Sequence, residues 1–364
     1  MKTLLALGAA AVLLAACGKG SSDSSGESNA AGSGGAAAGG ARAVWTAGSS
    51  TVFPFASRVS ENFAQKTGRP APRVESLGTG GGIKAFCTGV GPKTPDVANA
   101  SRPMKASEFE LCASNGVTDI IEVQIGYDGV VVANNRQGAA YALTLEDLYR
   151  GLAAQVPGAG GAYTDNPNGT WRQVRAALPA ERIQVYGPPP TSGTRDAFVE
   201  LGMEAGARKL PVLAALSESD EDAFKQRAGA LREDGGWIDS GENDNAILQT
   251  LTRTPGSLGV FGYSFLEQNP DQVKAASIDG VAPSPGTIQD GSYPLARSLY
   301  IYVKKAHLGV TPGLREFVQE FLSEASAARG GYLQNRGLIP LPAERLAATR
   351  QAFTAGTAMT KPAK

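Results

Sequence analysis

The sequence predicts an α/β protein built from two lobes, and three observations support this prediction. A unit of strand, loop rich in Gly, Ser and Thr, and helix occurs twice between Ala43 and Cys87, an alternation typical of α/β folds with parallel strands. The length of 364 residues exceeds what a single hydrophobic core usually supports, so two lobes are expected. The hydrophobic content of 42% is sufficient for packed cores and excludes global disorder.

Apolar spacing and turn residues define the elements of the N-terminal half. Residues 43–46 form a short strand pattern, and Phe55, Val59 and Phe63 then recur at helical spacing up to Gly68. The remaining patterns of this half predict, in order, a strand at 73–77, a helix opening at 83–87, strands at 119–125 and 129–133 interrupted by Gly126-Tyr127-Asp128, and a helix capped by Thr144.

The C-terminal half continues the alternation. Its patterns predict, in order, a strand at 183–186, a helix from Arg195 to about Ala205, strands at 258–265 and 299–303, a helix around 317–322, and a short helix with a frayed end over the last 20 or so residues. No repeat array interrupts this order. The whole pattern is therefore that of a globular α/β chain.

The balance of charge restricts the possible partners. Lys and Arg number 34 and Asp and Glu also number 34, so the formal net charge is zero. Nucleic-acid binders usually carry a basic stripe and a high pI, so we expect no nucleic-acid partner. A single histidine, His307, and three cysteines argue against the usual zinc and iron sites, so we expect neither a metal nor a cofactor. Zero net charge does not exclude an anion ligand.

The first residues predict export and a lipid anchor. Lys2, the apolar run from Leu4 to Leu14 and the small residues before Cys17 are typical of a lipoprotein signal peptide over residues 1–16. The alternative is an ordinary signal peptide with an incidental cysteine. Residues 17–42 would comprise the lipidated Cys17 and a flexible tether of mostly Gly, Ala and Ser. We therefore expect an extracytoplasmic monomer that contacts a membrane only through its lipid.

If Cys17 is acylated, Cys87 and Cys112 remain as an even pair in an exported protein. Such a pair favours a disulfide. In the chain-entropy model a bridge closing a loop of this length stabilises the fold by about 3.5 kcal/mol. The alternative is two buried thiols.

Three loops combine glycine with hydroxyl side chains between a strand and a helix: 48–51, 78–82 and 192–195. The first amides of a helix lack internal partners and the helix dipole adds partial positive charge there. Such loops can bind an oxyanion. The alternative is ordinary capping and turn formation. None of the loops matches a Walker pattern or a Gly-x-Gly-x-x-Gly fingerprint, which disfavours a nucleotide pocket.

Two arginines near these loops could add charge to the site. The guanidinium of Arg102 or Arg195 offers a planar fork for bidentate contact with an oxyanion. Arg195 at a helix start opposes the helix dipole, a cost that a bound anion would offset. The alternative for each is a surface salt bridge, for Arg195 with Asp196 or Glu200.

Together these segments resemble the phosphate-binding proteins of bacterial phosphate ABC transporters, in the branch with a Ser-Arg-Pro motif. The resemblance covers roughly residues 44–345 and is carried by the lipobox and by 47–54, 78–84, 98–103, 191–195, 258–263 and 293–297. It implies a type II periplasmic-binding-protein fold, in which crossover strands join two lobes that close on the ligand. Expected boundaries are 43–127 and 258–345 for lobe 1, 128–257 for lobe 2, and 346–364 for a C-terminal tail.

The resemblance also implies a ligand, inorganic phosphate, and a partner, the permease of an ABC transporter. Its motifs place the ligand contacts at Ser50, Thr51, Thr79, Ser101 and Arg102 in the first lobe and at Ser192, Gly193, Thr194 and Arg195 in the second. The best-known members carry an Asp where Arg102 stands and an Arg near Pro188. Asp128 is therefore our candidate acceptor for the ligand's proton, and its alternative role is a turn-forming Asp before Gly.

Two other functions and one other ligand class compete with a non-enzymatic phosphate receptor. A phosphate-ester hydrolase needs a nucleophile with a base, or metals that activate water, and His307 has no carboxylate cluster beside it in sequence. A surface lipoprotein for signalling or adhesion would keep the pocket as a relic. Sulfate or another tetrahedral oxyanion is the alternative ligand.

Overall fold

The computed structural model describes residues 42–158, 162–241 and 243–363, which belong to one compact unit, Ala41–Lys364. The predicted signal peptide, the lipidation site Cys17 and the predicted tether up to residue 41 lie outside the described residues. No helix among the described residues is both long and apolar enough to cross a membrane.

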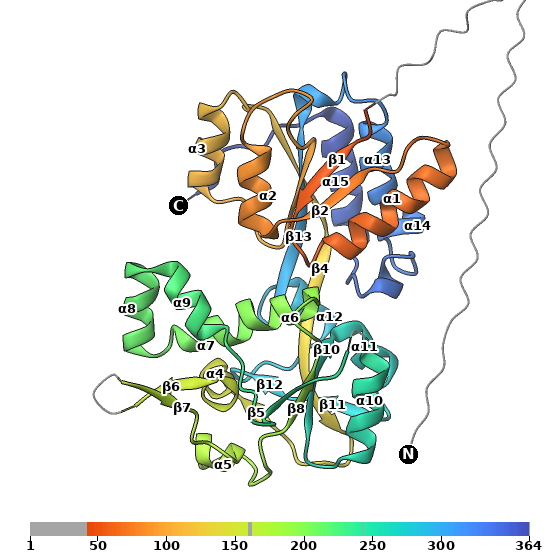
Figure 1. Ribbon diagram of the computed structural model, residues 1–364. Coiled ribbons are helices and arrows are strands. Elements are labelled where there is room, and N and C mark those ends of the chain that lie inside the picture. The colour runs from red at the N-terminus through yellow and green to blue at the C-terminus, as the bar shows by residue number, and fades with distance from the viewer. Residues whose placement is uncertain (1–41, 159–161, 242, 364) are drawn as a thin grey trace, which may run out of the picture. The chain divides into compact units, whose positions relative to one another are not determined.

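The first lobe is a sheet with helices on both faces (Figure 1). Parallel strands β2, β1 and β3 lie side by side in that order, and β13 continues the sheet antiparallel to β3. The elements of this lobe are β1 (Trp45–Gly48), α1 (Phe53–Thr67), β2 (Arg73–Ser76), α2 (Gly78–Phe86), β3 (Val97–Ala100), α3 (Ala106–Ser114), η3 (Lys305–His307), α13 (Leu314–Phe321), α14 (Glu324–Ala327), η4 (Gln334–Arg336) and α15 (Ala343–Ala355).

The strand β4 (Ile120–Asn135) and the strand β13 (Ala296–Lys304) connect the two lobes. The first half of β4 pairs with β13, and its second half pairs with β10 (Leu258–Gly262) and β11 (Val273–Ala275). We predicted two strands separated at residues 126–128, and this prediction is wrong. The chain stays extended there because those residues pair with residues 297–299 of β13, which the sequence pattern did not show.

The second lobe has a parallel core of β10, β8 and β9 flanked by helices. Two small sheets, β5 with β12 and β6 with β7, lie beside it. Its remaining elements are β5 (Ala142–Leu143), α4 (Leu145–Leu152), β6 (Gln155–Pro157), β7 (Tyr163–Asp165), α5 (Trp171–Val174), β8 (Val185–Gly187), α6 (Gly193–Phe198), the π-helical η2 (Val199–Glu204), α7 (Ala205–Ala207), α8 (Pro211–Ser219), α9 (Glu221–Ala228), β9 (Trp237–Asp239), α10 (Asp244–Arg253), α11 (Tyr263–Gln268), β12 (Ser277–Ile278) and α12 (Pro285–Gln289).

Strand pairing changes the predicted lobe boundary. Residues 258–295 were expected in the first lobe, but β10 pairs with β8 and with the second half of β4, so this segment belongs to the second lobe. The chain returns to the first lobe only with β13. The predicted tail from residue 346 is also more ordered than expected, because Leu346 and Phe353 on α15 are buried.

The predicted disulfide is present. Cys87, at the end of α2, is bonded to Cys112 on α3. Both cysteines are fully buried in a small hydrophobic cluster with Phe86 and Met104. The bridge therefore joins the two helices that flank the loop following β3, where Ser101 and Arg102 lie.

Candidate functional site

The predicted site residues converge on a cleft between the lobes. Its larger part has a volume of about 640 Å³ and is lined by Ser50, Thr51, Thr79, Ser101, Arg102 and Arg297, among others. An adjoining part of about 530 Å³ is lined by Thr51, Asp128, Ser192, Gly193 and Thr194, among others. Thr51 borders both parts. Nine of the ten predicted ligand residues thus line one or the other part of the cleft, and Arg195 lines neither part.

Ser49 orders the loop before α1 and leaves the next two hydroxyls facing the cleft. The Ser49 amide donates to the Asn99 carbonyl at 2.9 Å, and its carbonyl accepts from the Phe53 amide at 3.0 Å. Its hydroxyl accepts from the Val52 amide at 3.3 Å. Ser49 therefore serves as the cap of this turn, while Ser50 and Thr51 line the cleft.

The glycine run at the start of α2 permits a close approach between two chain segments. A Cβ added at Gly82 would lie 2.2 Å from the Cα of Gly48. Thr79, in the first turn of this helix, lies against the next loop: its hydroxyl is 3.0 Å from the Ser101 hydroxyl and accepts from the Ser101 amide at 3.1 Å. Glycine packing thus brings the hydroxyls of two loops together.

Arg102 lines the cleft but is already paired. Its Nη1 and Nη2 atoms donate to the two carboxylate oxygens of Glu108 at 2.9 and 2.7 Å. Hydrogen bonding to Glu108 raises the pKa of Arg102. Burial tends to raise the pKa of Glu108, but the bonds from Arg102 and from the Lys105 amide outweigh burial and lower it. A ligand could reach Arg102 only by sharing it with Glu108 or by displacing Glu108.

The second wall is set by a tight contact between the lobes. Ser192 caps the helix by accepting from the Thr194 amide at 3.2 Å. A Cβ added at Gly193 would lie 3.0 Å from the Thr51 Cα and 3.1 Å from the Ser50 carbonyl oxygen. Glycine at this position therefore lets the start of α6 approach the loop before α1.

Arg195 lies outside both parts of the cleft that the other predicted ligand residues line. Its Nη1 donates to Asp239 Oδ1 at 2.8 Å and to the Pro188 carbonyl at 3.0 Å. Its guanidinium lies over the Trp237 ring, 4.5 Å from the ring centroid. This contact with β9 fixes Arg195 within the second lobe, and its ion-pair partner is neither Asp196 nor Glu200.

Arg297 is the residue of the cleft that our prediction of site residues missed. It lies on β13 with only 7% of its side chain exposed. Nη2 donates to Thr51 Oγ1 and Nη1 to Glu200 Oε2, both at 2.5 Å. Nε is 3.6 Å from Asp128 Oδ2. Arg297 belongs to the segment 293–297, one of those that carry the resemblance to phosphate-binding proteins, and this was its one sequence signal. Its position beside Thr51 results from the strand pairing of β13, which that segment does not predict.

Asp128 and Arg297 face each other without a hydrogen bond between them. A separation of 3.6 Å is too long for one, and both Asp128 Oδ2 and Arg297 Nε are buried without a hydrogen-bond partner. Burial raises the pKa of Asp128, and the positive charge of Arg297 acts in the opposite direction. The pair leaves one buried donor and one buried acceptor uncommitted at the point where the two parts of the cleft meet.

Comparison with known proteins decides the family. A model of the PBP superfamily domain matches residues 31–325. The chain belongs to the PBP superfamily. Protein SphX of Synechococcus elongatus is 32% identical over 319 residues, covering 86% of this chain and 82% of that protein. The phosphate-binding protein PstS of Staphylococcus haemolyticus is 30% identical over 335 residues, covering 89% of each chain.

Solved structures agree with this assignment. The crystal structure of a possible phosphate-binding protein from Planctomyces limnophilus superposes with a TM-score of 0.69 at 31% identity, over 86% of this chain and 98% of that chain. The predicted resemblance to phosphate-binding proteins and the predicted two-lobe α/β fold are both confirmed.

Several carboxylates of this PBP-superfamily protein also line the cleft, on the second lobe. Asp196 accepts a hydrogen bond from the Ser50 hydroxyl, and Glu200 accepts one from Arg297. Glu204 is 8% exposed, and burial raises its pKa to about 7. Its nearest basic partner is Arg208, at 3.7 Å.

His307 lies in the first lobe, with both ring nitrogens engaged. Nδ1 is hydrogen-bonded to Asp96 Oδ1 at 2.7 Å, and Nε2 accepts from the Gly91 amide at 3.0 Å. Thr311 also donates to Asp96, at 2.8 Å. Within the described part of the chain, no three His, Cys, Asp or Glu side chains are grouped so that they could hold a metal ion.

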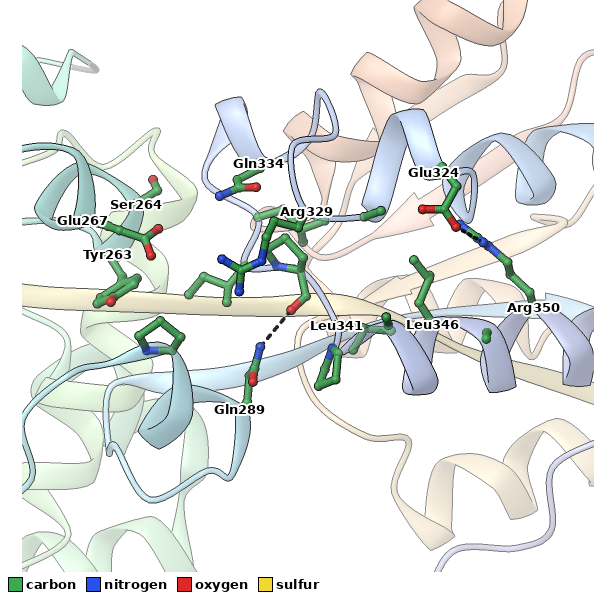
Figure 2. Close-up of a pocket in the computed structure, with 18 residues that line it drawn as sticks. Tyr263, Ser264, Glu267, Gln289, Glu324, Arg329, Gln334, Leu341, Leu346 and Arg350 are labelled. Atoms are coloured by element: carbon green, nitrogen blue, oxygen red, sulfur yellow. Dashed lines mark hydrogen bonds and ion pairs between the residues drawn. The ribbon is translucent and has the colours of Figure 1, made fainter.

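A second cavity between the lobes, of about 470 Å³, is lined by α11, α12 and the C-terminal segment (Figure 2). Gln289 lines this cavity, and its Nε2 donates a hydrogen bond to the Pro340 carbonyl at 3.1 Å. Apolar residues such as Leu341 and Leu346 form much of its wall. None of the predicted ligand residues lies there, although Ser264 lines both this cavity and the part of the cleft that Asp128 lines.

Proposed function

We propose that this protein captures inorganic phosphate in the interlobe cleft and delivers it to the permease of an ABC transporter, without catalysing a reaction. Relatives named phosphate-binding protein PstS, from two Staphylococcus species, support the ligand. The relative from Planctomyces limnophilus, described as a possible phosphate-binding protein, supports the same ligand.

The observation that carries the proposal is the convergence of hydroxyls and one buried arginine from both lobes on a single cleft. Ser50, Thr51, Thr79 and Ser101 come from the first lobe, and Ser192 and Thr194 come from the second. Arg297 supplies a nearly buried positive charge at their centre. Hydroxyls, helix-start amides and a guanidinium are the donors that a dehydrated oxyanion needs.

We further propose different roles for the three arginines. Arg297 would contact phosphate directly, because its guanidinium lies beside Thr51 within the cleft. Arg102 would contribute from the rim while remaining bonded to Glu108. Arg195 would hold the second wall in place through Asp239 and Trp237 rather than touch the ligand.

Asp128 would distinguish phosphate from sulfate. Near neutral pH phosphate carries a proton that can be donated, and sulfate carries none. The uncommitted Asp128 Oδ2 is a buried acceptor beside Arg297. A sulfate oxygen placed against this carboxylate would be repelled, and the acceptor would stay unpaired, which costs free energy.

The remaining parts of the proposal concern location and partners. A signal peptide over residues 1–16 and lipidation at Cys17 would place the protein outside the cytoplasm on a membrane surface. Residues 18–41, rich in Gly, Ala and Ser, would act as the tether. We predicted that the tether extends to Arg42, but Arg42 belongs to the first lobe, because its guanidinium donates to Asp96 and to the Thr94 carbonyl. The protein would work as a monomer, because the proposed cleft is formed by one chain.

A receptor fits the chemistry of the cleft better than a phosphate-ester hydrolase does. Hydrolysis needs an activated nucleophile or a metal-bound water. His307 cannot act as a base in the cleft, because its ring nitrogens are engaged by Asp96 and Gly91 within the first lobe.

Calorimetric titration of the purified protein with inorganic phosphate tests the proposal. We expect submicromolar binding of phosphate, at least tenfold weaker binding of sulfate, and no turnover of p-nitrophenyl phosphate. Absence of phosphate binding would refute the receptor function. Equal affinity for sulfate would leave the receptor function standing and refute the proposed role of Asp128.

A further inference from the structure

Two carboxylates of the second lobe occupy donor groups that the cleft offers to an anion. The Ser50 hydroxyl donates to Asp196 Oδ2, and Arg297 Nη1 donates to Glu200 Oε2 at 2.5 Å. Asp196 and Glu200 are four residues apart on the continuous helical run from α6 into η2, so they lie on one face of it. Each carboxylate therefore reaches out of the second lobe, one to the first lobe and one to the connecting strand β13.

The contact between Glu200 and Arg297 adds little as a stabilising salt bridge. The Glu200 side chain is 48% exposed, whereas that of Arg297 is 7% exposed, so solvent at the carboxylate screens the attraction between the two charges. Arg297 also has a second, more buried carboxylate neighbour in Asp128. The fold therefore does not depend on Glu200 to compensate the charge of Arg297.

The same contact is chemically equivalent to binding an oxyanion. A carboxylate oxygen and a phosphate oxygen are both anionic acceptors for a guanidinium N–H group. Arg297 donates through Nη2 to Thr51 and through Nη1 to Glu200. Phosphate that binds beside Thr51 and contacts both Nη atoms of Arg297 would compete with Glu200 for Nη1.

We propose that Glu200 is a built-in competitor for the anion site: it holds Nη1 of Arg297 while the cleft is empty, and phosphate that binds to Nη1 displaces it. This inference rests on the proposed function. Glu200 lowers phosphate affinity in two ways, because its hydrogen bond to Arg297 has to be broken and its negative charge repels the incoming anion. A receptor that must release its ligand thereby carries a displacing group within the cleft.

The variant Glu200→Gln separates this role from its opposite, in which Glu200 accepts the proton of bound phosphate. Glutamine keeps the size of the side chain and removes its charge. A competitor that loses its charge lets both phosphate and sulfate bind more tightly, by about 3- to 10-fold, as expected for loss of one partly exposed charge contact. A proton acceptor that becomes glutamine would instead weaken phosphate binding and leave sulfate binding less affected.

A matched control is available in the same lobe. Glu218 on α8 is exposed and lies outside the cleft, so Glu218→Gln makes the same change in net charge without touching Arg297. The experiment is calorimetric titration of the full mature chain with inorganic phosphate and, separately, with sulfate, for the wild type and both variants. Thermal unfolding without ligand checks that each variant is folded.

The inference predicts tighter phosphate binding for Glu200→Gln and unchanged binding for Glu218→Gln. If the wild type binds phosphate and Glu200→Gln binds equally or more weakly, Glu200 is no competitor while the receptor function stands. If Glu218→Gln gains as much affinity as Glu200→Gln, the effect comes from net charge and the inference is also wrong. If neither the wild type nor Glu200→Gln binds phosphate, the proposed function and this inference both fail.

Discussion

Replacing Arg297 is the most direct test of the cleft chemistry. The side chain is 7% exposed and donates 2.5 Å hydrogen bonds to Thr51 and Glu200. In Arg297→Lys a single ammonium replaces the planar fork, so the positive charge remains and the second directed contact is lost. A hydrogen bond to a charged group contributes about 1.5–3 kcal/mol. We therefore expect phosphate binding to weaken by about 10- to 100-fold, at about 1.4 kcal/mol per tenfold change.

The more severe variant Arg297→Gln removes the charge and leaves Asp128 buried without its cationic neighbour. We expect at least a 100-fold loss of phosphate affinity, because a charge-assisted contact disappears and the Asp128 charge is no longer balanced. Stability falls as well, so thermal unfolding has to accompany the titration. Arg253, exposed at the end of α10 and outside the cleft, supplies the matched controls Arg253→Gln and Arg253→Lys.

Calorimetry at fixed pH and ionic strength measures these changes. If folded Arg297→Lys and Arg297→Gln both bind phosphate within threefold of the wild type, Arg297 does not contact the ligand. The anion would then have to be held by hydroxyls and amides alone, or by Arg102 after it leaves Glu108. The reasoning from burial and hydrogen-bond geometry would be refuted.

Three further outcomes follow from other parts of the structure. Replacing Cys87 and Cys112 by Ala should lower the free energy of unfolding by about 3.5 kcal/mol in urea titrations, and a loss below 1 kcal/mol would contradict this. Gly82→Ala should destabilise the first lobe and weaken phosphate binding, because its Cβ would lie 2.2 Å from the Gly48 Cα; wild-type melting and affinity would show that the approach is not needed. Glu204 has a pKa raised by burial to about 7, so the folded state binds its proton more tightly than the unfolded state does. The free energy of unfolding should therefore fall by up to about 3 kcal/mol as pH rises from 4.5 to 8. Urea titrations of Glu204→Gln over this pH range should lack this part of the pH dependence. If the variant and the wild type show the same pH dependence, the pKa of Glu204 is not raised in the folded protein.

Local sequence signals were sufficient for several helices, such as α1 and α4, and for the family. Phe55, Val59 and Phe63 are all buried on α1, as their spacing predicted. Thr144 caps α4 through the Asp147 amide at 3.1 Å. Both features depend on residues close in sequence, and such signals are readable without tertiary contacts.

Long-range strand pairing could not be predicted from local sequence. The segment 126–128 contains a glycine and an Asp that usually mark a turn, yet it continues β4 because β13 lies beside it. The pairing of β10 with β4 and β8 assigns residues 258–295 to the second lobe. Neither result could follow from local propensity, since the partner strands are more than seventy residues away.

The candidate site likewise has features that local sequence predicted and features that depend on long-range contacts. Glycine- and hydroxyl-rich loops before helices identified Thr51, Thr79 and Thr194 as residues that line the cleft. The arginines were harder to assign, because a guanidinium takes its role from whichever carboxylate lies within reach. Arg195 reaches Asp239 and Arg102 reaches Glu108.

The sequence by itself determined the α/β class, the two-lobe organisation, the disulfide pair and the loops that can bind an oxyanion, because each of these depends on composition, on periodicity or on motifs of a few adjacent residues. Only the tertiary structure decided which positive charge lies at the centre of the cleft. Arg297 is placed there by the pairing of β13 with β4, which sets it beside Asp128 and Thr51. Asp128 is 169 positions from Arg297 in the sequence, and Thr51 is 246 positions from it. Contacts over such separations have no signature in the sequence around either partner.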